Sequence, residues 1–172
     1  SSSLSPILRV GAEKAVVSVA DIDTAKVKAT VSKYGLTSLD PQGIVTSECD
    51  IFAPCALGAI LNTENINALN CSIIAGAANN QLAIEDEHGI MIKEKGLLYA
   101  PDFLINAGGL INVYSEYIGY NRENAMRDTE KIFDTTLNIF DLAETQGIHT
   151  QKAATILAQK RIDDILSVQS TY

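Results

Sequence analysis

The feature that most constrains the fold of this 172-residue chain is an apolar run that stops at two adjacent carboxamides. The run is Ile73-Ile74-Ala75-Gly76-Ala77-Ala78, and Asn79 and Asn80 follow it directly. Its unbroken apolar character is typical of a strand that is covered on both faces of a parallel sheet. Because ligands of open α/β sheets bind at the carboxyl ends of the strands, the run predicts a buried strand that delivers Asn79 and Asn80 to a ligand.

Segments with the character of strands alternate with segments of helical periodicity. Residues 15–19 are a short β-rich run, and residues 24–34 show helical spacing before Gly35. Further strands are predicted at residues 49–54, 72–77, 96–101 and 102–106, with a helical stretch at 63–69, a polar turn at 85–89 and the last turns of a helix at 6–10, before Gly11. The alternation predicts an α/β fold with a three-layer, Rossmann-like, doubly wound and mostly parallel sheet.

The sequence after residue 109 has helical periodicity to its end. Asn121 can cap a helix that Gly147 closes, and Thr150 can start another. The apolar stripes predicted to face inward contain Ala125, Thr129, Ile132, Phe133, Thr136, Leu137, Phe140 and Ala143 on the first helix, and Ala154, Leu157, Ala158, Arg161, Ile162 and Ile165 on the second. Residues 1–120 are therefore expected to form the sheet domain, with residues 121–172 packing on it as two long helices in a single structural unit.

Composition and charge narrow the classes of partner. The formal net charge of −8 and a pI near 4.7 argue against nucleic-acid binding, which requires a basic surface. The apolar runs are too short for a membrane span, and the first residues lack the pattern of a secretory signal, so a cytoplasmic protein without a membrane partner is expected. Cys49, Cys55 and Cys71 match neither a zinc motif nor a CxxC pair. Buried, reduced thiols are expected, with a nucleophilic Cys55 as the alternative.

Asp21 follows the first predicted strand, where a carboxylate has two possible roles. In a dinucleotide-binding fold, a carboxylate at a strand tip accepts hydrogen bonds from the adenosine ribose hydroxyls, and its charge repels the 2′-phosphate of NADP. This reading favours NAD over NADP. Alternatively, Asp21 or Asp23 caps the helix that starts near Thr24. Both roles remain open at this stage, since each member of the pair can fill a different one.

Asn79 and Asn80 also have two interpretations. A carboxamide offers a donor and an acceptor without a charge, which suits a nicotinamide amide or a substrate carboxylate. The alternative is a cap for a helix over residues 80–85. Gly108-Gly109 permits close backbone approach or a strained turn, but taken in isolation an ordinary turn is the favoured explanation. The sequence contains no Ser-His-Asp arrangement and no metal-ligand cluster, and neither His88 nor His149 is expected to be catalytic.

Four motifs in one order resemble the C-terminal half of the Glu/Leu/Phe/Val dehydrogenase family, and the leucine dehydrogenases above all. The motifs are Phe52-Ala53-Pro54-Cys55-Ala56-Leu57-Gly58-Ala59, Ala75-Gly76-Ala77-Ala78-Asn79-Asn80-Gln81-Leu82, Tyr99-Ala100-Pro101-Asp102-Phe103-Leu104-Ile105-Asn106-Ala107-Gly108-Gly109 and Gly119-Tyr120-Asn121-Arg122-Glu123. The resemblance extends from about Gly11 to Tyr172. It implies oxidative deamination of a branched-chain L-amino acid to its 2-oxo acid and ammonium, with NAD as hydride acceptor, in a cleft between two domains.

The resemblance also implies roles for individual residues. Asp21 would bind the adenosine ribose, Ala56-Leu57-Gly58 would line the cofactor path, and Ala77-Ala78-Asn79 would meet the nicotinamide ribose or ring. Asn79 would in addition lie close to the substrate. The segment Asn106-Ala107-Gly108-Gly109 would border the nicotinamide pocket, so residues 1–120 would be a partial NAD-binding domain.

The sequence departs from the family at its beginning. It contains no G-x-G, whereas the family carries a Gly-rich turn before the acidic strand tip, and it lacks the N-terminal domain with the catalytic lysines and aspartate. A fragment with no catalytic residue of its own, weak NAD affinity and no turnover alone is therefore expected. An unpaired strand edge predicts a homo-oligomer, or association with the missing domain. Two alternatives remain: a non-catalytic nucleotide-binding module, and an interaction module that binds no nucleotide.

Overall fold

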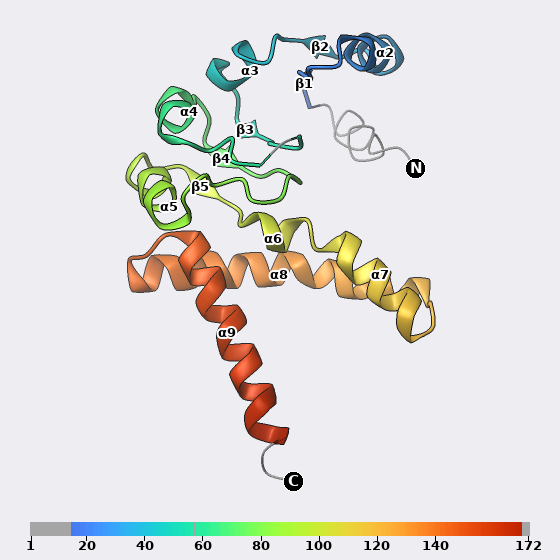
Figure 1. Cartoon of the computed structure of the whole chain (residues 1–172), viewed down its shortest axis with the longest axis vertical. Coiled ribbons are helices and arrows are strands. Elements are labelled where there is room, and N and C mark those ends of the chain that lie inside the picture. The colour runs from blue at the N-terminus through green and yellow to red at the C-terminus, as the bar shows by residue number, and fades with distance from the viewer. Residues whose placement is uncertain (1–14, 57, 170–172) are drawn as a thin grey trace. The chain divides into compact units, whose positions relative to one another are not determined.

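The computed structural model describes residues 15–56 and 58–169, which Figure 1 shows as ribbons. The predicted helix end at residues 6–10 and the candidate Leu57 lie outside the described residues. Two compact units are distinguished, residues 1–48 with 68–70 and residues 49–67 with 71–172. Among the helices described, none combines the length and hydropathy needed to cross a bilayer.

The first unit contains a β-α-β segment with parallel strands. Strand β1 (Ser18–Val19) is followed by helix α2 (Thr24–Tyr34), strand β2 (Thr37–Ser38) and the short helix α3 (Gly43–Thr46). Ser18 pairs with Thr37 in the parallel ladder. Helix α2 has the predicted bounds because its ends are specified locally: the Asp23 carboxylate accepts the backbone N–H groups of residues 25 and 26, and Gly35 closes the helix at φ 65°. Strand β2 was not predicted.

The second unit contains a three-stranded parallel sheet. Strands β3 (Ile51–Phe52), β4 (Ile73–Ile74) and β5 (Leu98–Tyr99) lie in this order and alternate along the chain with helices α4 (Thr63–Ala68) and α5 (Glu85–Glu94). Ile51 pairs with Ile73, which in turn pairs with Leu98. Ile74 is fully buried in the central strand, as the unbroken apolar run predicts. The α/β class with parallel strands is confirmed, in the form of two short sheets.

Four helices complete the second unit. They are α6 (Asp102–Ile105), α7 (Gly108–Ile118), α8 (Arg122–Gln146) and α9 (Thr150–Gln169). The predicted caps of α8 are confirmed, since the Asn121 side chain accepts the N–H of Asn124 and Gly147 ends the helix in the left-handed conformation. A core cluster of Ile139, Ala143, Ala153 and Ala154 joins α8 to α9.

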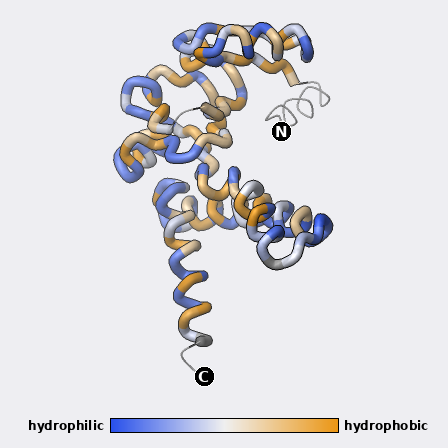
Figure 2. The backbone as a smooth tube through the Cα atoms, turned by 45° about the vertical axis from the view of Figure 1, so that its right-hand side comes forward, coloured by the Kyte–Doolittle hydropathy of each residue, from blue (hydrophilic) through white to orange (hydrophobic). Residues whose placement is uncertain are grey.

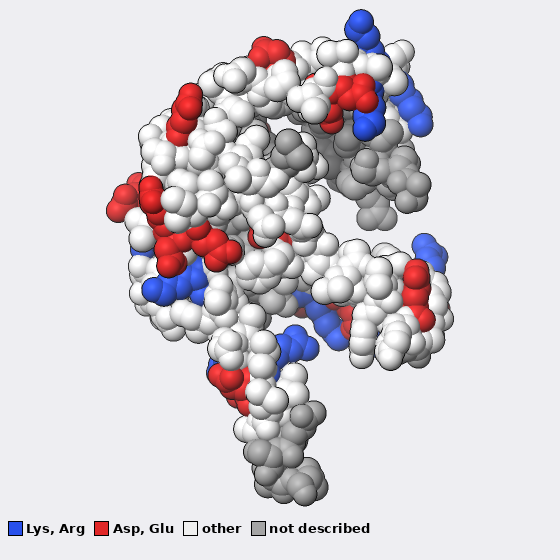
Figure 3. Space-filling view, viewed as in Figure 1, with Lys and Arg blue, Asp and Glu red and all other residues white. Residues whose placement is uncertain are grey.

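Three local predictions were wrong. The expected polar turn at residues 85–89 is the first half of α5, where three consecutive acidic residues favour a helix N-terminus through the helix dipole. Figure 3 shows acidic side chains gathered over this helix. The expected strand at residues 102–106 is the helical turn α6, because the ladder to β4 ends at the hydrogen bond from Ala100 N to Ile74 O. Gly108 and Gly109 open α7 and do not form a turn.

The apolar stripes of the two long helices are buried only in part. On α8, Phe133 and Leu137 were predicted to face inward, but 67% and 49% of their surfaces are exposed. On α9, Ile162 and Ile165 are about half exposed at 51% and 53%. Figure 2 shows apolar and polar segments alternating along α9. Periodicity predicts which residues share a face, but burial requires a neighbouring element, and among the described residues α8 and α9 cover each other near their junction only.

Candidate functional site

A carboxamide of the loop after β4, Asn79, meets a second carboxamide from the end of α6, Asn106. The Asn106 side chain, at the end of α6, donates from Nδ2 to Asn79 Oδ1 at 2.5 Å and lies 3.5 Å from the carbonyl oxygen of Ala77. Asn79 and Ala77 are exposed, and Asn106 is half-buried. The Nδ2 group of Asn79 donates no hydrogen bond within the described part of the chain. Two predicted site residues are thus in contact, with a hydrogen-bond donor facing solvent.

Asn80 shapes the backbone of this loop and does not cap a helix. It adopts φ 53° in the left-handed region, which asparagine tolerates better than most residues. Its carbonyl oxygen accepts the N–H of Ala59 at 2.7 Å. A Cβ at Gly58 would lie 2.9 Å from the carbonyl oxygen of Asn79, so only glycine allows the loops after β3 and β4 to approach so closely. The alternative of a helix over residues 80–85 is therefore excluded.

A buried glutamine and a buried aspartate stabilise the loop after β4 by hydrogen bonds to its backbone. Gln81 is fully buried, and its Nε2 donates to the carbonyl oxygens of Gly76 at 2.7 Å and Ala78 at 2.9 Å. The backbone N–H of Gln81 donates to Asp102 Oδ2 at 2.9 Å, and Asp102 Oδ1 accepts the N–H of Phe103 at 2.7 Å. The sequence reasoning missed both residues as site components. The position of Asp102, just beyond the end of β5, is the signal that could have found it.

Gly76 allows the strand ends themselves to approach. A Cβ at this position would lie 2.1 Å from the carbonyl oxygen of Pro54, a distance that no side chain tolerates. The same oxygen accepts the N–H of Ala78 at 3.0 Å, which places Ala78 in the buried floor of the loop. Ala56 is exposed in the loop after β3. The candidates Ala56, Gly58, Ala77, Ala78, Asn79 and Asn106 all belong to the second unit.

Asp21 belongs to the first unit. The sequence left open whether Asp21 or Asp23 caps helix α2, and the structure answers this question. Asp23 is the cap of α2, since its Oδ1 accepts the N–H groups of Ala25 and Lys26, each at 3.1 Å. Asp21 accepts a single hydrogen bond, from the N–H of Asp23 to Oδ1 at 2.9 Å. Its side chain is exposed, and Oδ2 accepts no hydrogen bond from the described residues. Asp21 is therefore free of the capping role and available to a ligand.

The two histidines have structural environments. His88 is buried, accepts the N–H of Ile84 on Nδ1 at 2.8 Å, and places Nε2 3.3 Å from Thr63 Oγ1. His149 is buried with its Nε2 3.4 Å from Asp86 Oδ1. Burial lowers the pKa of His149, and the Asp86 carboxylate opposes this shift. Both rings are held at the beginning of a helix by these contacts. Within the described residues, neither ring forms a hydrogen bond with the loop after β4.

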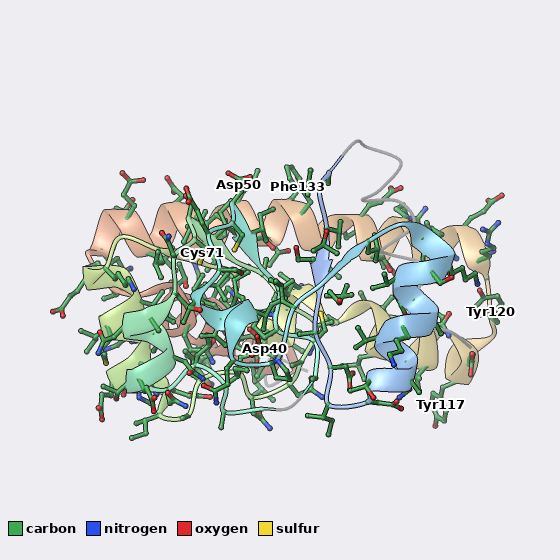
Figure 4. The ribbon with its side chains drawn as sticks, turned by 90° about the horizontal axis from the view of Figure 1, so that it is seen from above. Asp40, Asp50, Cys71, Tyr117, Tyr120 and Phe133 are labelled. Carbon is green, nitrogen blue, oxygen red and sulfur yellow. The ribbon has the colours of Figure 1, made fainter. Side chains whose placement is uncertain are left out.

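The three thiols differ in exposure, and one pocket of the described chain contains none of the candidate residues in its wall. Cys55 is exposed, and Cys49 and Cys71 are half-buried, so the prediction of buried thiols was wrong for Cys55. A pocket of about 390 Å³ lies between α7 and α8, with Tyr114 and Arg127 in its wall and none of the candidate residues. Figure 4 labels Tyr117, on α7, and Tyr120, in the connection between α7 and α8. Within the described residues, no group of three or more His, Cys, Asp or Glu side chains could hold a metal ion.

Comparisons with a family model and with individual known proteins indicate the same family. The model of the Glutamate/Leucine/Phenylalanine/Valine dehydrogenase family matches residues 8–169. Leucine dehydrogenase of Thermoactinomyces intermedius is 48% identical over 160 residues, which are 93% of this chain and 43% of that protein. L-tryptophan dehydrogenase of Nostoc punctiforme is 51% identical over 146 residues, 85% of this chain and 41% of that protein. The chain thus spans less than half the length of the curated relatives it matches.

Solved structures agree with the sequence matches. The crystal structure of L-tryptophan dehydrogenase from Nostoc punctiforme has a TM-score of 0.82 at 50% identity, covering 86% of this chain and 44% of that one. A glutamate dehydrogenase from Thermus thermophilus, with a TM-score of 0.65 and 22% identity over 88% of this chain and 38% of its own, shares the fold. The chain belongs to the Glutamate/Leucine/Phenylalanine/Valine dehydrogenase family of amino acid dehydrogenases.

Proposed function

We propose that the chain is the NAD-binding portion of an enzyme that oxidatively deaminates a branched-chain L-amino acid, with leucine as the first candidate, to its 2-oxo acid and ammonium. The observation that carries the proposal is the hydrogen bond between Asn106, at the end of α6, and Asn79, in the loop at the carboxyl end of the parallel strand β4, in a chain of this family. Residues 1–120 form the cofactor-binding part, and residues 121–172 pack on it as helices. A cytoplasmic location is part of the proposal.

NAD is the proposed cofactor, and the charge at Asp21 supports this choice. Asp21 Oδ2 is free to accept a hydrogen bond from a ribose hydroxyl, whereas the 2′-phosphate of NADP would meet a carboxylate that forms no ion pair with a cation among the described residues. Ala56, Leu57 and Gly58 line the cofactor path, and Ala77, Ala78 and Asn79 meet the nicotinamide ribose or ring. Gly58 has no side chain and the residues beside Asn79 have small ones, so a flat ring can approach the backbone at this place.

The proposed role of the two carboxamides is orientation. NAD, when bound, accepts the hydride of the reaction. Asn79 presents an uncharged donor to the nicotinamide or to the substrate, and the bond from Asn106 fixes its rotamer. Gln81 and Asp102 hold the backbone beneath it. Since none of these groups is placed to move a proton, acid–base catalysis is assigned to residues outside this chain, and the chain alone is expected not to turn over.

The proposal includes association through an exposed apolar surface on α7 and α8. Apolar side chains of α7 and α8 are exposed, with Leu110 at 73%, Val113 at 61% and Phe133 at 67%. An apolar surface of this kind favours association with a second copy or with the polypeptide that carries the catalytic residues. A chain that sediments as a monomer, both alone and with that polypeptide, would contradict this part of the proposal.

Calorimetric titration with NAD⁺ tests the site. Asp21→Ala is expected to weaken NAD⁺ binding by about tenfold or more, because a hydrogen bond to a charged group contributes about 1.5–3 kcal/mol. The same variant should narrow the preference for NAD⁺ over NADP⁺. Glu48→Ala, which removes an exposed acidic side chain of the same unit, is the matched control. Equal affinities for the two variants would refute the role of Asp21.

A second candidate is a nucleotide-binding or interaction module without catalysis, since the described hydrogen-bond partners at Asn79 and Asn106 are carboxamide and carbonyl groups that do not exchange protons. The discriminating assay mixes the chain with the remaining portion of a leucine dehydrogenase and follows NADH formation with L-leucine and L-tryptophan. Restored turnover supports the enzyme and ranks the substrates. NAD⁺ binding without turnover in any mixture would support the module instead.

A further inference from the structure

Two cysteines stand opposite each other where β3 and β4 begin. Glu48 bridges to Asn70 and Ile51 pairs with Ile73, so one register runs through both segments and places Cys49 opposite Cys71. The two cysteines form what we call the thiol pair. Neighbouring strands lie about 4.8 Å apart, and this spacing falls inside the range of about 4.4–6.8 Å that disulfides span between Cα atoms.

The local backbone keeps the thiol pair in this arrangement. The carbonyl oxygen of Asp50 accepts the N–H groups of Ser72 at 3.1 Å and Ile73 at 3.0 Å, immediately after the two cysteines. Side chains at matched positions of parallel strands point to the same face of the sheet. Both thiols are half-buried and both are free. Figure 4 labels Cys71 and Asp50, which mark the two segments.

We propose that Cys49 and Cys71 are an oxidisable dithiol that closes to an intrachain disulfide when it meets a small-molecule disulfide such as oxidised glutathione. One cysteine thiolate attacks a sulfur of the oxidised glutathione, and one glutathione thiolate leaves and takes up a proton. The second cysteine then attacks the protein sulfur of the mixed disulfide, and the second glutathione leaves. The pair loses two electrons and two protons, and one molecule of oxidised glutathione becomes two of reduced glutathione.

The surroundings of the thiol pair raise the pKa of both thiols. Burial raises the pKa of Cys71, and the neighbouring Cys49 adds to the increase. Burial also raises the pKa of Cys49, with Asp50 contributing. Closure therefore accelerates as the pH rises, because the thiolate is the attacking form. A disulfide needs a Cβ separation of about 3.5–4.5 Å, less than the strand spacing, so closure draws the strands together and leaves a bond that is easily reduced.

The disulfide would leave the candidate site open. The thiol pair precedes Ile51 and Ile73, at the amino ends of β3 and β4, whereas Asn79 follows the carboxyl end of β4. Oxidation is thus a modification of the scaffold that can be measured without any ligand or turnover. Cys55 lies beyond the carboxyl end of β3, is exposed, and has no cysteine at the matched position of β4, so it serves as an internal comparison.

Peptide mapping after treatment of the folded chain with oxidised glutathione tests the proposal. Remaining thiols are alkylated, and the chain is digested without reductant and analysed by mass spectrometry. The expected product is a cross-linked peptide containing Cys49 and Cys71, two hydrogen atoms lighter than the separate peptides and lost after reduction, while Cys55 carries a glutathione. Cys55→Ser should retain the cross-link, and Cys71→Ser should convert Cys49 to a glutathione adduct.

A parallel reaction in denaturant separates folded geometry from chance pairing. The cross-link between Cys49 and Cys71 should dominate in the folded chain and lose its preference over pairs that include Cys55 in the unfolded chain. This comparison uses the unsubstituted chain and therefore does not depend on the folding of any variant. Recovery of both cysteines as alkylated thiols or separate glutathione adducts, or equal cross-linking in both conditions, would overturn the proposal.

Discussion

Removing the Asp102 carboxylate is expected to loosen the loop that carries Asn79. The carboxylate is 5% exposed and accepts two backbone N–H groups, those of Gln81 and Phe103. In Asp102→Ala both donors lose their acceptor. Phe103 is 45% exposed, so water can replace its lost partner. Gln81 is fully buried, and its unsatisfied N–H is expected to cost about 1–3 kcal/mol.

The loss should be visible in both stability and local opening. With about 2 kcal/mol lost and a urea dependence of about 1–3 kcal/mol per M, the urea midpoint of the second unit should fall by about 1 M. Asp102→Asn keeps one acceptor oxygen, which can still serve Gln81, so a smaller decrease is expected. Amide hydrogen exchange followed by mass spectrometry should show faster exchange in the peptide that contains Gln81, because its hydrogen bond no longer protects it.

Asp134→Ala is the matched control for Asp102→Ala. Asp134 is exposed on α8 and accepts no hydrogen bond from the described residues. Its removal is expected to change the free energy of unfolding by no more than about 0.5 kcal/mol. If Asp102→Ala and Asp134→Ala shift the urea midpoint equally, and exchange at Gln81 stays unchanged, the structural role assigned to Asp102 is refuted.

Two further perturbations follow from the packing. Gly76→Ala would place a Cβ 2.1 Å from the carbonyl oxygen of Pro54 and should lower the free energy of unfolding by about 1–3 kcal/mol, whereas Gly109→Ala, with no atom within 4 Å, should not destabilise; urea titration of both variants checks this. His149 has a folded-state pKa lowered by burial from 6.5, so the unfolded chain binds more protons below about pH 6.5. Stability should therefore fall as the pH drops through that value and level off below the folded pKa, and His149→Gln should flatten this part of a urea-midpoint profile. A profile that keeps its slope in the variant would contradict the assignment to His149.

Sequence patterns predicted most of what depends on near neighbours. Asp23 and Gly35 specify the ends of α2, and Asn121 and Gly147 specify those of α8, because each cap bonds to groups within a few residues of itself. The position of Asn79 after a buried strand was also predictable, since an apolar run of this length and composition suits a central parallel strand. The sequence motifs around Asn79 were sufficient to indicate the family.

Predictions failed where a segment has the right residues for two structures. Residues 102–106 are apolar enough for a strand, but the sheet provides hydrogen-bonding partners only as far as Ala100, and the chain turns into α6. Phe133 has the spacing of an inward-facing residue but lies on a part of α8 that the described chain leaves uncovered. In both cases the outcome depends on what lies alongside, which periodicity does not contain.

The sequence by itself determined the family, the α/β class with alternating strands and helices, and the position of Asn79 after a strand, because local hydrogen bonding and hydrophobic periodicity depend on adjacent residues. Only the tertiary structure decided that Asn106 donates a hydrogen bond to Asn79, that Asp102 accepts one from Gln81 21 residues away, and that the register places Cys49 opposite Cys71. These contacts follow from strand register and from the close approach of loops at Gly58 and Gly76. Register is a property of paired strands, so it is fixed when the sheet forms and not by either strand alone.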